Sequence, residues 1–291
     1  MSASALRSLT ASASWCALTL LWATSHACAN PLPTQRPPPI AGLPYQLVKD
    51  WTFGQTVDDI DTLRAEFHTR YIYNNGQLDR LNDEWQRYRD NDNHVLDSDH
   101  LTLVARAPRG LGAGKIESGM LRSRWSGTYG YFEARLKVPP GRGFWPAFWL
   151  NPQDQIWPPE IDIVEIVNNG RDTTRHSFHF VHPGKPTCSA TTHSALDRLH
   201  RYTPGADYAE AFHTFAVHWE PGRIRHYVDA QLVVDRACEW NHRDGRHAGA
   251  AHVLLNLAVG GRWPGPPKRL QDFPARLEVQ FIRVWQRQAA P

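Results

Sequence analysis

Pro158-Pro159-Glu160-Ile161-Asp162-Ile163-Val164-Glu165-Ile166-Val167 combines a run of β-branched residues with three carboxylates. The isoleucines and valines favour a strand, and the two prolines prevent a helix from running into the segment. A buried strand does not carry several acidic groups unless they line a cleft, because an unpaired buried charge is costly. The segment therefore predicts a strand with one buried face and with acidic side chains facing a cleft.

The spacing of the three acids predicts a β-bulge in this strand. In a regular strand Glu160 and Asp162 share one face, and Glu165 points into the core on the other. One extra residue near Ile163-Val164 reverses the alternation and returns Glu165 to the face of Glu160. The alternative is an ordinary charged strand edge, which the isoleucine and valine neighbours argue against.

Carboxylates on one face can hydrolyse a glycosidic bond. One acts as nucleophile and the other protonates the leaving oxygen, and a separation of about 5–5.5 Å between them gives retention of configuration. A third acid between the two keeps the proton of one glutamate in place by like-charge repulsion and hydrogen bonding.

Residues 1–29 are expected to be a signal peptide. Arg7 is the only charge before the apolar run at 15–23, which is too short to span a bilayer. Ala27-Cys28-Ala29 gives the small-x-small pattern of a cleavage site. A lipoprotein anchor at Cys28 is the alternative, but Ser25 stands where such a site would want leucine. We expect a secreted or periplasmic protein.

The remainder is expected to contain a proline-rich linker at residues 30–47 and one catalytic domain at residues 48–288. Its two cysteines, Cys188 and Cys238, are predicted to form a disulfide, with two unpaired thiols as the alternative. The net charge of +3 and the lack of a basic face with interleaved aromatics argue against nucleic acid. No long apolar segment follows the leader, so no membrane partner is expected, and we expect a monomer.

Period-two alternation dominates this domain and predicts many antiparallel strands. Only residues 59–67, with an aspartate cap, are typical of a helix, so the fold class is all-β, a sandwich or a barrel. The predicted strands cover Leu101–Ala105, Ile116–Arg124, Tyr129–Val138, His213–Trp219, Ile224–Asp229, Gln231–Asp235, Val253–Val259 and Leu277–Trp285.

Aromatic residues just before the acidic segment suggest a sugar-binding surface. Trp145, Ala147 and Trp149 share a face if their segment is extended, and an aromatic ring can cover the apolar face of a sugar. We expect Trp149 to face the cleft without core neighbours, although both tryptophans could instead be core residues. Asn82 lies in a polar loop and could bind sugar hydroxyls, the alternative being a solvated loop.

Three histidines, His176, His179 and His182, are spaced by three residues. On a strand His179 takes the opposite face from the other two, which is a poor arrangement for one metal ion. His179 is instead expected to be a partner of a cleft acid.

Several motifs, taken together, resemble glycoside hydrolase family sixteen, in particular its bacterial laminarinase-like members with a bulged acidic motif. The motifs run in order across nearly all of the expected mature chain, and they are Asn82–Gln86, Tyr129–Arg135, Trp145–Trp149, Glu160–Glu165, His179-Phe180, Asn256–Gly261 and Arg283–Trp285.

The resemblance implies a β-jelly-roll sandwich of two curved antiparallel sheets with a concave cleft for a polysaccharide. It implies a retaining mechanism with Glu160 as nucleophile, Glu165 as acid/base and Asp162 assisting. It also implies a histidine near the acid/base and several substrate-binding residues, which are His179, Asn82, Trp145, Trp149 and Trp263. No cofactor is implied, and although the family often carries a structural calcium ion, no ligand set for it is legible.

The implied activity is endo-hydrolysis of β-1,3- or mixed β-1,3-1,4-glucan. Residues 67–89 depart from the commonest laminarinase sequence, which leaves the polysaccharide open. The alternatives are an endoglycanase on a galactan or a bacterial exopolysaccharide, a transglycosylase that uses the same intermediate, and a glucan-binding module. Such modules lack the two glutamates that this chain retains.

Overall fold

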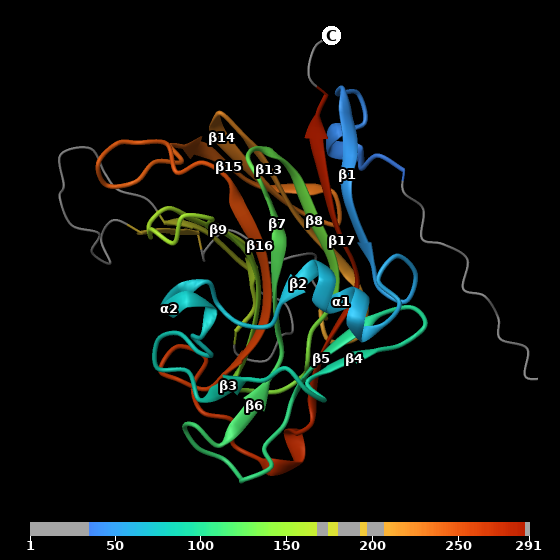
Figure 1. Ribbon diagram of the computed structural model, residues 1–291, viewed down its shortest axis with the longest axis vertical. Coiled ribbons are helices and arrows are strands. Elements are labelled where there is room, and N and C mark those ends of the chain that lie inside the picture. The colour runs from blue at the N-terminus through green and yellow to red at the C-terminus, as the bar shows by residue number, and fades with distance from the viewer. Residues whose placement is uncertain (1–34, 168–173, 180–192, 197–206, 289–291) are drawn as a thin grey trace, which may run out of the picture. The chain divides into compact units, whose positions relative to one another are not determined.

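Two antiparallel β-sheets form the structure, a computed structural model that describes residues 35–167, 174–179, 193–196 and 207–288 (Figure 1). The side chains of His179 and of residues 193–196 are not described. The all-β sandwich predicted from the alternation is confirmed. The predicted signal peptide lies outside the described residues. No helix among the residues that are described is long and apolar enough to cross a membrane.

One sheet has eight strands in the order β15-β14-β13-β8-β17-β5-β4, and β1 also pairs with β17. Its strands are β1 (Tyr45–Thr52), β4 (His94–Leu96), β5 (Leu101–Ala105), β8 (Gly130–Lys137), β13 (His213–Glu220), β14 (Gly222–Val228), β15 (Gln231–Cys238) and β17 (Ala275–Arg287).

The other sheet has seven strands in the order β12-β11-β10-β9-β16-β7-β2. Its strands are β2 (Phe67–His68), β7 (Met120–Gly127), β9 (Phe144–Pro152), β10 (Glu160–Glu165), β11 (Arg175–His179), β12 (His193–Leu196) and β16 (Ala251–Val259). The two short strands β3 (Gln86–Tyr88) and β6 (Ile116–Ser118) pair in parallel outside these sheets.

The main core lies between the two sheets. On β8 the alternate residues Phe132, Ala134 and Leu136 are buried in it, as the period-two pattern predicts. The opposite face of β8 is also covered, because Tyr131 packs in a second buried cluster with Tyr45. The eight-stranded sheet is therefore buried on both faces at this point.

The segment before β1 covers that second face, which corrects the predicted linker. Residues 38–40 form a 3-10 helix, Ile40 and Tyr45 are buried, and β1 pairs with β17 from Tyr45 onward. The expectation of an extended tether through residue 47 is therefore wrong for residues 38–47. Proline content alone predicted a tether, but buried Ile40 and Tyr45 fix the segment to the domain.

One predicted strand is divided into two, and the other predicted elements differ only at their limits. Residues 116–124, predicted as one strand, form β6 and the start of β7, separated at Gly119. A Cβ there would lie 2.6 Å from the Asn93 carbonyl oxygen, so the chain needs a glycine. The predicted helix is α1 (Ile60–Glu66), capped by Asp59, which accepts a hydrogen bond from the Thr62 amide at 2.7 Å. The short helix α2 (Tyr73–Gly76) and the 3-10 helix η3 (Leu270–Asp272) were not predicted.

Candidate active site

The register of β10 against its neighbours contains the predicted β-bulge. Against β9, Asp162 pairs with Trp149 and Val164 with Phe148, so Ile163 is the extra residue. Against β11 the register shifts between Asp162 and Glu165. Ile163 and Val164 are buried in the core, whereas the acids on either side of them turn to the opposite face.

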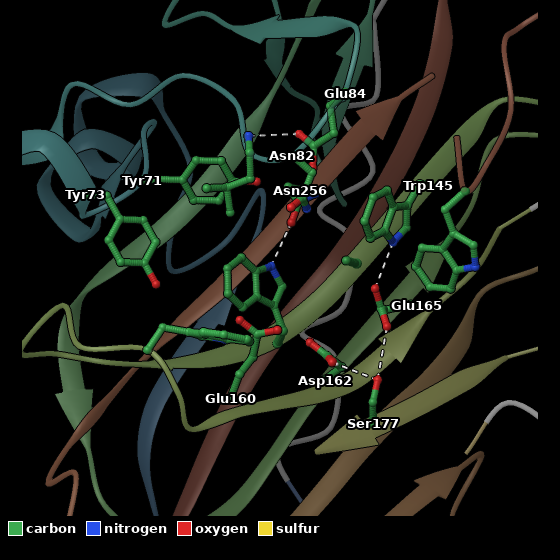
Figure 2. Close-up of a pocket in the computed structure, with 15 residues that line it drawn as sticks. Tyr71, Tyr73, Asn82, Glu84, Trp145, Glu160, Asp162, Glu165, Ser177 and Asn256 are labelled. Atoms are coloured by element: carbon green, nitrogen blue, oxygen red, sulfur yellow. Dashed lines mark hydrogen bonds between the residues drawn. The ribbon is translucent and has the colours of Figure 1, made fainter. Parts of the chain in front are cut away.

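A cavity of about 560 Å³ lies over this acidic face, and Glu160, Asp162 and Glu165 all line it (Figure 2). Its other lining residues come from β9, β11, β16 and the segments around residues 71–84, 157 and 263, and they are Tyr71, Tyr73, Leu81, Asn82, Glu84, Trp145, Ala147, Trp149, Trp157, Ser177, Asn256 and Trp263. The bulge therefore does what the acid spacing predicts, because it brings the third carboxylate into the same cavity.

Ser177 links two of the acids. Its hydroxyl lies 2.8 Å from Asp162 Oδ2 and 3.2 Å from Glu165 Oε2 (Figure 2). The other carboxylate oxygen of Glu165, Oε1, accepts a hydrogen bond from Trp145 Nε1 at 3.0 Å. Glu165 is thus held from both sides while it lines the cavity.

The loop before β3 brings a further carboxyl group to the cavity. Glu84 is buried, and its Oε2 accepts hydrogen bonds from Gln86 Nε2 and from the Leu81 amide. Burial raises the pKa of Glu84 to about 7, an effect that the hydrogen bond from Gln86 partly offsets. Asn82, two residues earlier, also lines the cavity.

Comparison with known proteins identifies the family to which the chain belongs. A family model described as glycosyl hydrolases family 16 matches residues 81–273, more than half of the 291 residues. The chain belongs to this family. Its fold agrees with that of the laminarinase catalytic domain from Thermotoga maritima MSB8, with a TM-score of 0.67 and 27% identity over 84% of this chain and 99% of that one. The family 16 chain is therefore a β-jelly-roll, as the resemblance implied.

Two curated relatives differ in the polysaccharide that their names indicate. A β-glucanase of Rhodothermus marinus is 32% identical over 180 residues, which cover 56% of this chain and 59% of that protein. A keratan-sulfate endo-1,4-β-galactosidase of Sphingobacterium multivorum is 30% identical over 263 residues, 84% of this chain and 56% of that protein. The family 16 chain spans 33% to 59% of the length of its first curated relatives.

The tryptophans predicted to bind sugar differ in how deeply their side chains are buried. Trp263 is 41% exposed and meets Trp145 edge-on, with ring centroids 4.7 Å apart, while the Arg175 guanidinium lies 5.4 Å from the Trp263 ring. Trp149 lines the cavity but is only 6% exposed, and its Nε1 donates to Asn256 Oδ1 at 2.8 Å. The expectation that Trp149 lacks core neighbours is therefore wrong, because it packs in a buried cluster with Tyr71.

Seven of the eight site residues predicted from the sequence line this one cavity. The eighth, His179, pairs with Glu160 through the main chain, and its side chain lies outside the described residues. Ser177 was missed although it lies two residues before His179 on the same strand, and period two would have placed both on one face. Glu84 was missed although it directly follows Asn82-Asp83.

Within the described ranges no group of three or more His, Cys, Asp or Glu side chains is gathered to hold a metal ion. Cys238 is buried, and burial raises the pKa of its thiol to about 12. Its expected partner Cys188 lies outside the described residues, so the disulfide stays a prediction.

Proposed function

We propose that this chain is a retaining endo-β-glycanase that hydrolyses β-1,3-glucan or mixed β-1,3-1,4-glucan. The observation that carries the proposal is the set of three acids on one face of β10, brought into a single cavity by the bulge at Ile163. Membership of a glycosidase family and the laminarinase fold support the same conclusion.

In the proposed first step, Glu160 attacks the anomeric carbon while Glu165 protonates the glycosidic oxygen, which leaves with the first product. In the second step, Glu165 removes a proton from water, and the water cleaves the glycosyl ester on Glu160. The two displacements together retain the anomeric configuration.

The contacts of Ser177 are compatible with a proton on Glu165. One hydroxyl carries one hydrogen, so Ser177 cannot donate fully to Asp162 Oδ2 and Glu165 Oε2 at once. If Ser177 donates to Asp162, its oxygen can accept a hydrogen bond from a protonated Glu165. Asp162 thereby assists by fixing the direction of the Ser177 hydroxyl.

The aromatic lining supports a polysaccharide substrate. Trp145, Trp157 and Trp263 line the cavity together with Tyr71 and Tyr73, and such rings cover the apolar faces of sugars while hydroxyl groups bond to polar neighbours. Asn82 and Asn256 supply amides for those hydroxyls. A β-galactan is the second candidate, because the keratan-sulfate endo-1,4-β-galactosidase matches 84% of this chain.

The test is product analysis on laminarin, lichenan, keratan sulfate, agarose and a bacterial exopolysaccharide. We expect the viscosity of laminarin or lichenan to fall well before reducing ends accumulate, and NMR to detect the β-anomer first. Cleavage of keratan sulfate or agarose alone would favour the galactan reading. Products longer than the substrate would indicate transglycosylation. Binding of a polysaccharide without cleavage would indicate a binding module.

The roles of the two glutamates are tested by azide rescue. Glu160→Ala should lose turnover and regain it with azide, which attacks from the vacated side and gives the inverted glycosyl azide. Glu165→Ala should retain activity on substrates with good leaving groups and give the retained azide. A product of inverted configuration from the unmodified protein would overturn the mechanism, because inverting enzymes separate their acids by about 6.5–9.5 Å.

A further inference from the structure

The bulge that presents Glu165 faces a single residue on the neighbouring strand. On β11, Ser177 pairs with Asp162 and Arg175 pairs with Glu165, so His176 alone stands opposite both Ile163 and Val164. His176 has no exposed surface, and its position between Ser177 and Arg175 directs its side chain away from the cavity and toward the core.

The imidazole of His176 holds the main chain of the bulge. A bulge removes a residue from the regular ladder, and a buried carbonyl left without a donor is costly. His176 Nδ1 donates to the carbonyl oxygen of Ile163 at 2.5 Å, and Thr174 Oγ1 lies 2.9 Å from His176 Nε2. Because a carbonyl can only accept, Nδ1 carries the hydrogen, and in the neutral imidazole Nε2 accepts from the Thr174 hydroxyl.

A second buried histidine, His226, supports this arrangement from the eight-stranded sheet. It lies on the inner face of β14, and its ring centroid is 5.2 Å from that of His176. Burial lowers the pKa of His226 well below its ordinary value, and the charge that His176 would carry lowers it further. The Asp162 main chain and Arg236 are the other groups that act on its pKa, in opposite directions. His226 is therefore a neutral ring that packs against His176.

We propose that His176 is a positioning residue that fixes the bulge of β10 and so the direction in which Glu165 meets the glycosidic oxygen. This inference rests on the proposed function of Glu165 as acid/base. Glu160 lies before the bulge, where the register of β10 with β11 is regular, so loss of the His176 contact should disturb the proton donor and spare the nucleophile.

The test compares two substrates with three variants at position 176. Asparagine places an amide nitrogen close to the Nδ1 position, whereas glutamine places it close to Nε2 and leucine has no donor. For His176→Leu and His176→Gln, we expect kcat/KM on the unactivated glycan to fall about 100-fold or more, the usual scale of general acid catalysis. On a dinitrophenyl glycoside of the same sugar, which needs little protonation, the loss should stay below about 10-fold. His176→Asn should recover most of the lost activity.

His252→Leu is the matched control. His252 is also buried, and its Nδ1 donates to the Trp125 carbonyl at 3.1 Å, where the register of β16 against β7 shifts. It lines no part of the cavity, so its loss should affect the two substrates equally.

The outcomes separate this inference from the proposed function. Equal losses on both substrates in the His176 variants, or the same leaving-group dependence in His252→Leu, would overturn the positioning role. If His176→Leu does not fold, the comparison of His176→Asn with His176→Gln decides the question. Equal losses of kcat/KM in these two variants would overturn the inference. An unmodified protein that cleaves no glycan refutes the proposed function instead.

Discussion

At the scale of single residues, depth of burial separates side chains that share one cavity. Trp149 and Trp263 both line it, yet Trp149 is 6% exposed and Trp263 is 41% exposed. Glu84 is buried too, whereas Asn82, two positions earlier, is exposed. The period of a strand predicts which face a residue takes but not how much covers it, and for this reason the role expected of Trp149 was wrong.

Trp149→Ala is predicted to destabilise the protein. Removing a large buried aromatic ring costs about 3–5 kcal/mol, and the Asn256 amide oxygen would lose the donor that it now has. Unfolding in urea measures the change. Trp263→Ala is the control, since it should weaken polysaccharide binding and leave the midpoint within the range of a surface substitution. Equal stability of the two variants would contradict the prediction.

Glu84→Gln is predicted to flatten part of the pH dependence of stability. The pKa of Glu84 is raised from 4.5 to about 7, so its protonated form stabilises the folded state fully below pH 4.5, and this contribution is lost as the pH rises through 7. The variant keeps the acceptor oxygen for Gln86 but cannot ionise. Its free energy of unfolding relative to the unmodified protein should therefore increase between pH 4.5 and 7, by about 3 kcal/mol at most. Parallel curves over that range would contradict the assignment.

At the scale of elements, the sequence predicted what local pattern controls. The bulge followed from the alternation of β10, because only one extra residue brings Glu165 to the face of Glu160. Local pattern could not predict that residues 38–47 pack on the sheet, since their contacts are made with β17 more than two hundred positions away. The position of Glu84 likewise depends on the path of the loop before β3. Its hydrogen bonds follow from that path and not from a periodic pattern in the sequence.

Deleting Ile163 is predicted to leave the three acids on one face and to preserve activity. Without the extra residue, β10 can pair regularly with β9, and Glu160, Asp162 and Glu165 then occupy alternate positions that all face the cavity. Circular dichroism and thermal unfolding should report a folded protein, and assays on the glycan should detect turnover. A folded variant without turnover would indicate that the bulge itself is needed to aim Glu165.

At the scale of the whole domain, the two sheets have different roles. The seven-stranded sheet carries the acids on the face away from the core, and the eight-stranded sheet covers its inner face. His226 connects the two functions, since it belongs to the covering sheet and packs behind the acidic strand. The rigidity of the active face thus depends on a layer that contributes no residue to the cavity.

The position of β17 has a consequence for how the chain is made. It follows the other described strands in chain order, yet it lies between β8 on one edge and β5 and β1 on the other (Figure 1). While a ribosome is still adding residues before Ala275, those three strands have emerged with their inner edges unpaired. The eight-stranded sheet can close only after β17 has left the ribosome, so it cannot form in step with the synthesis of its earlier strands.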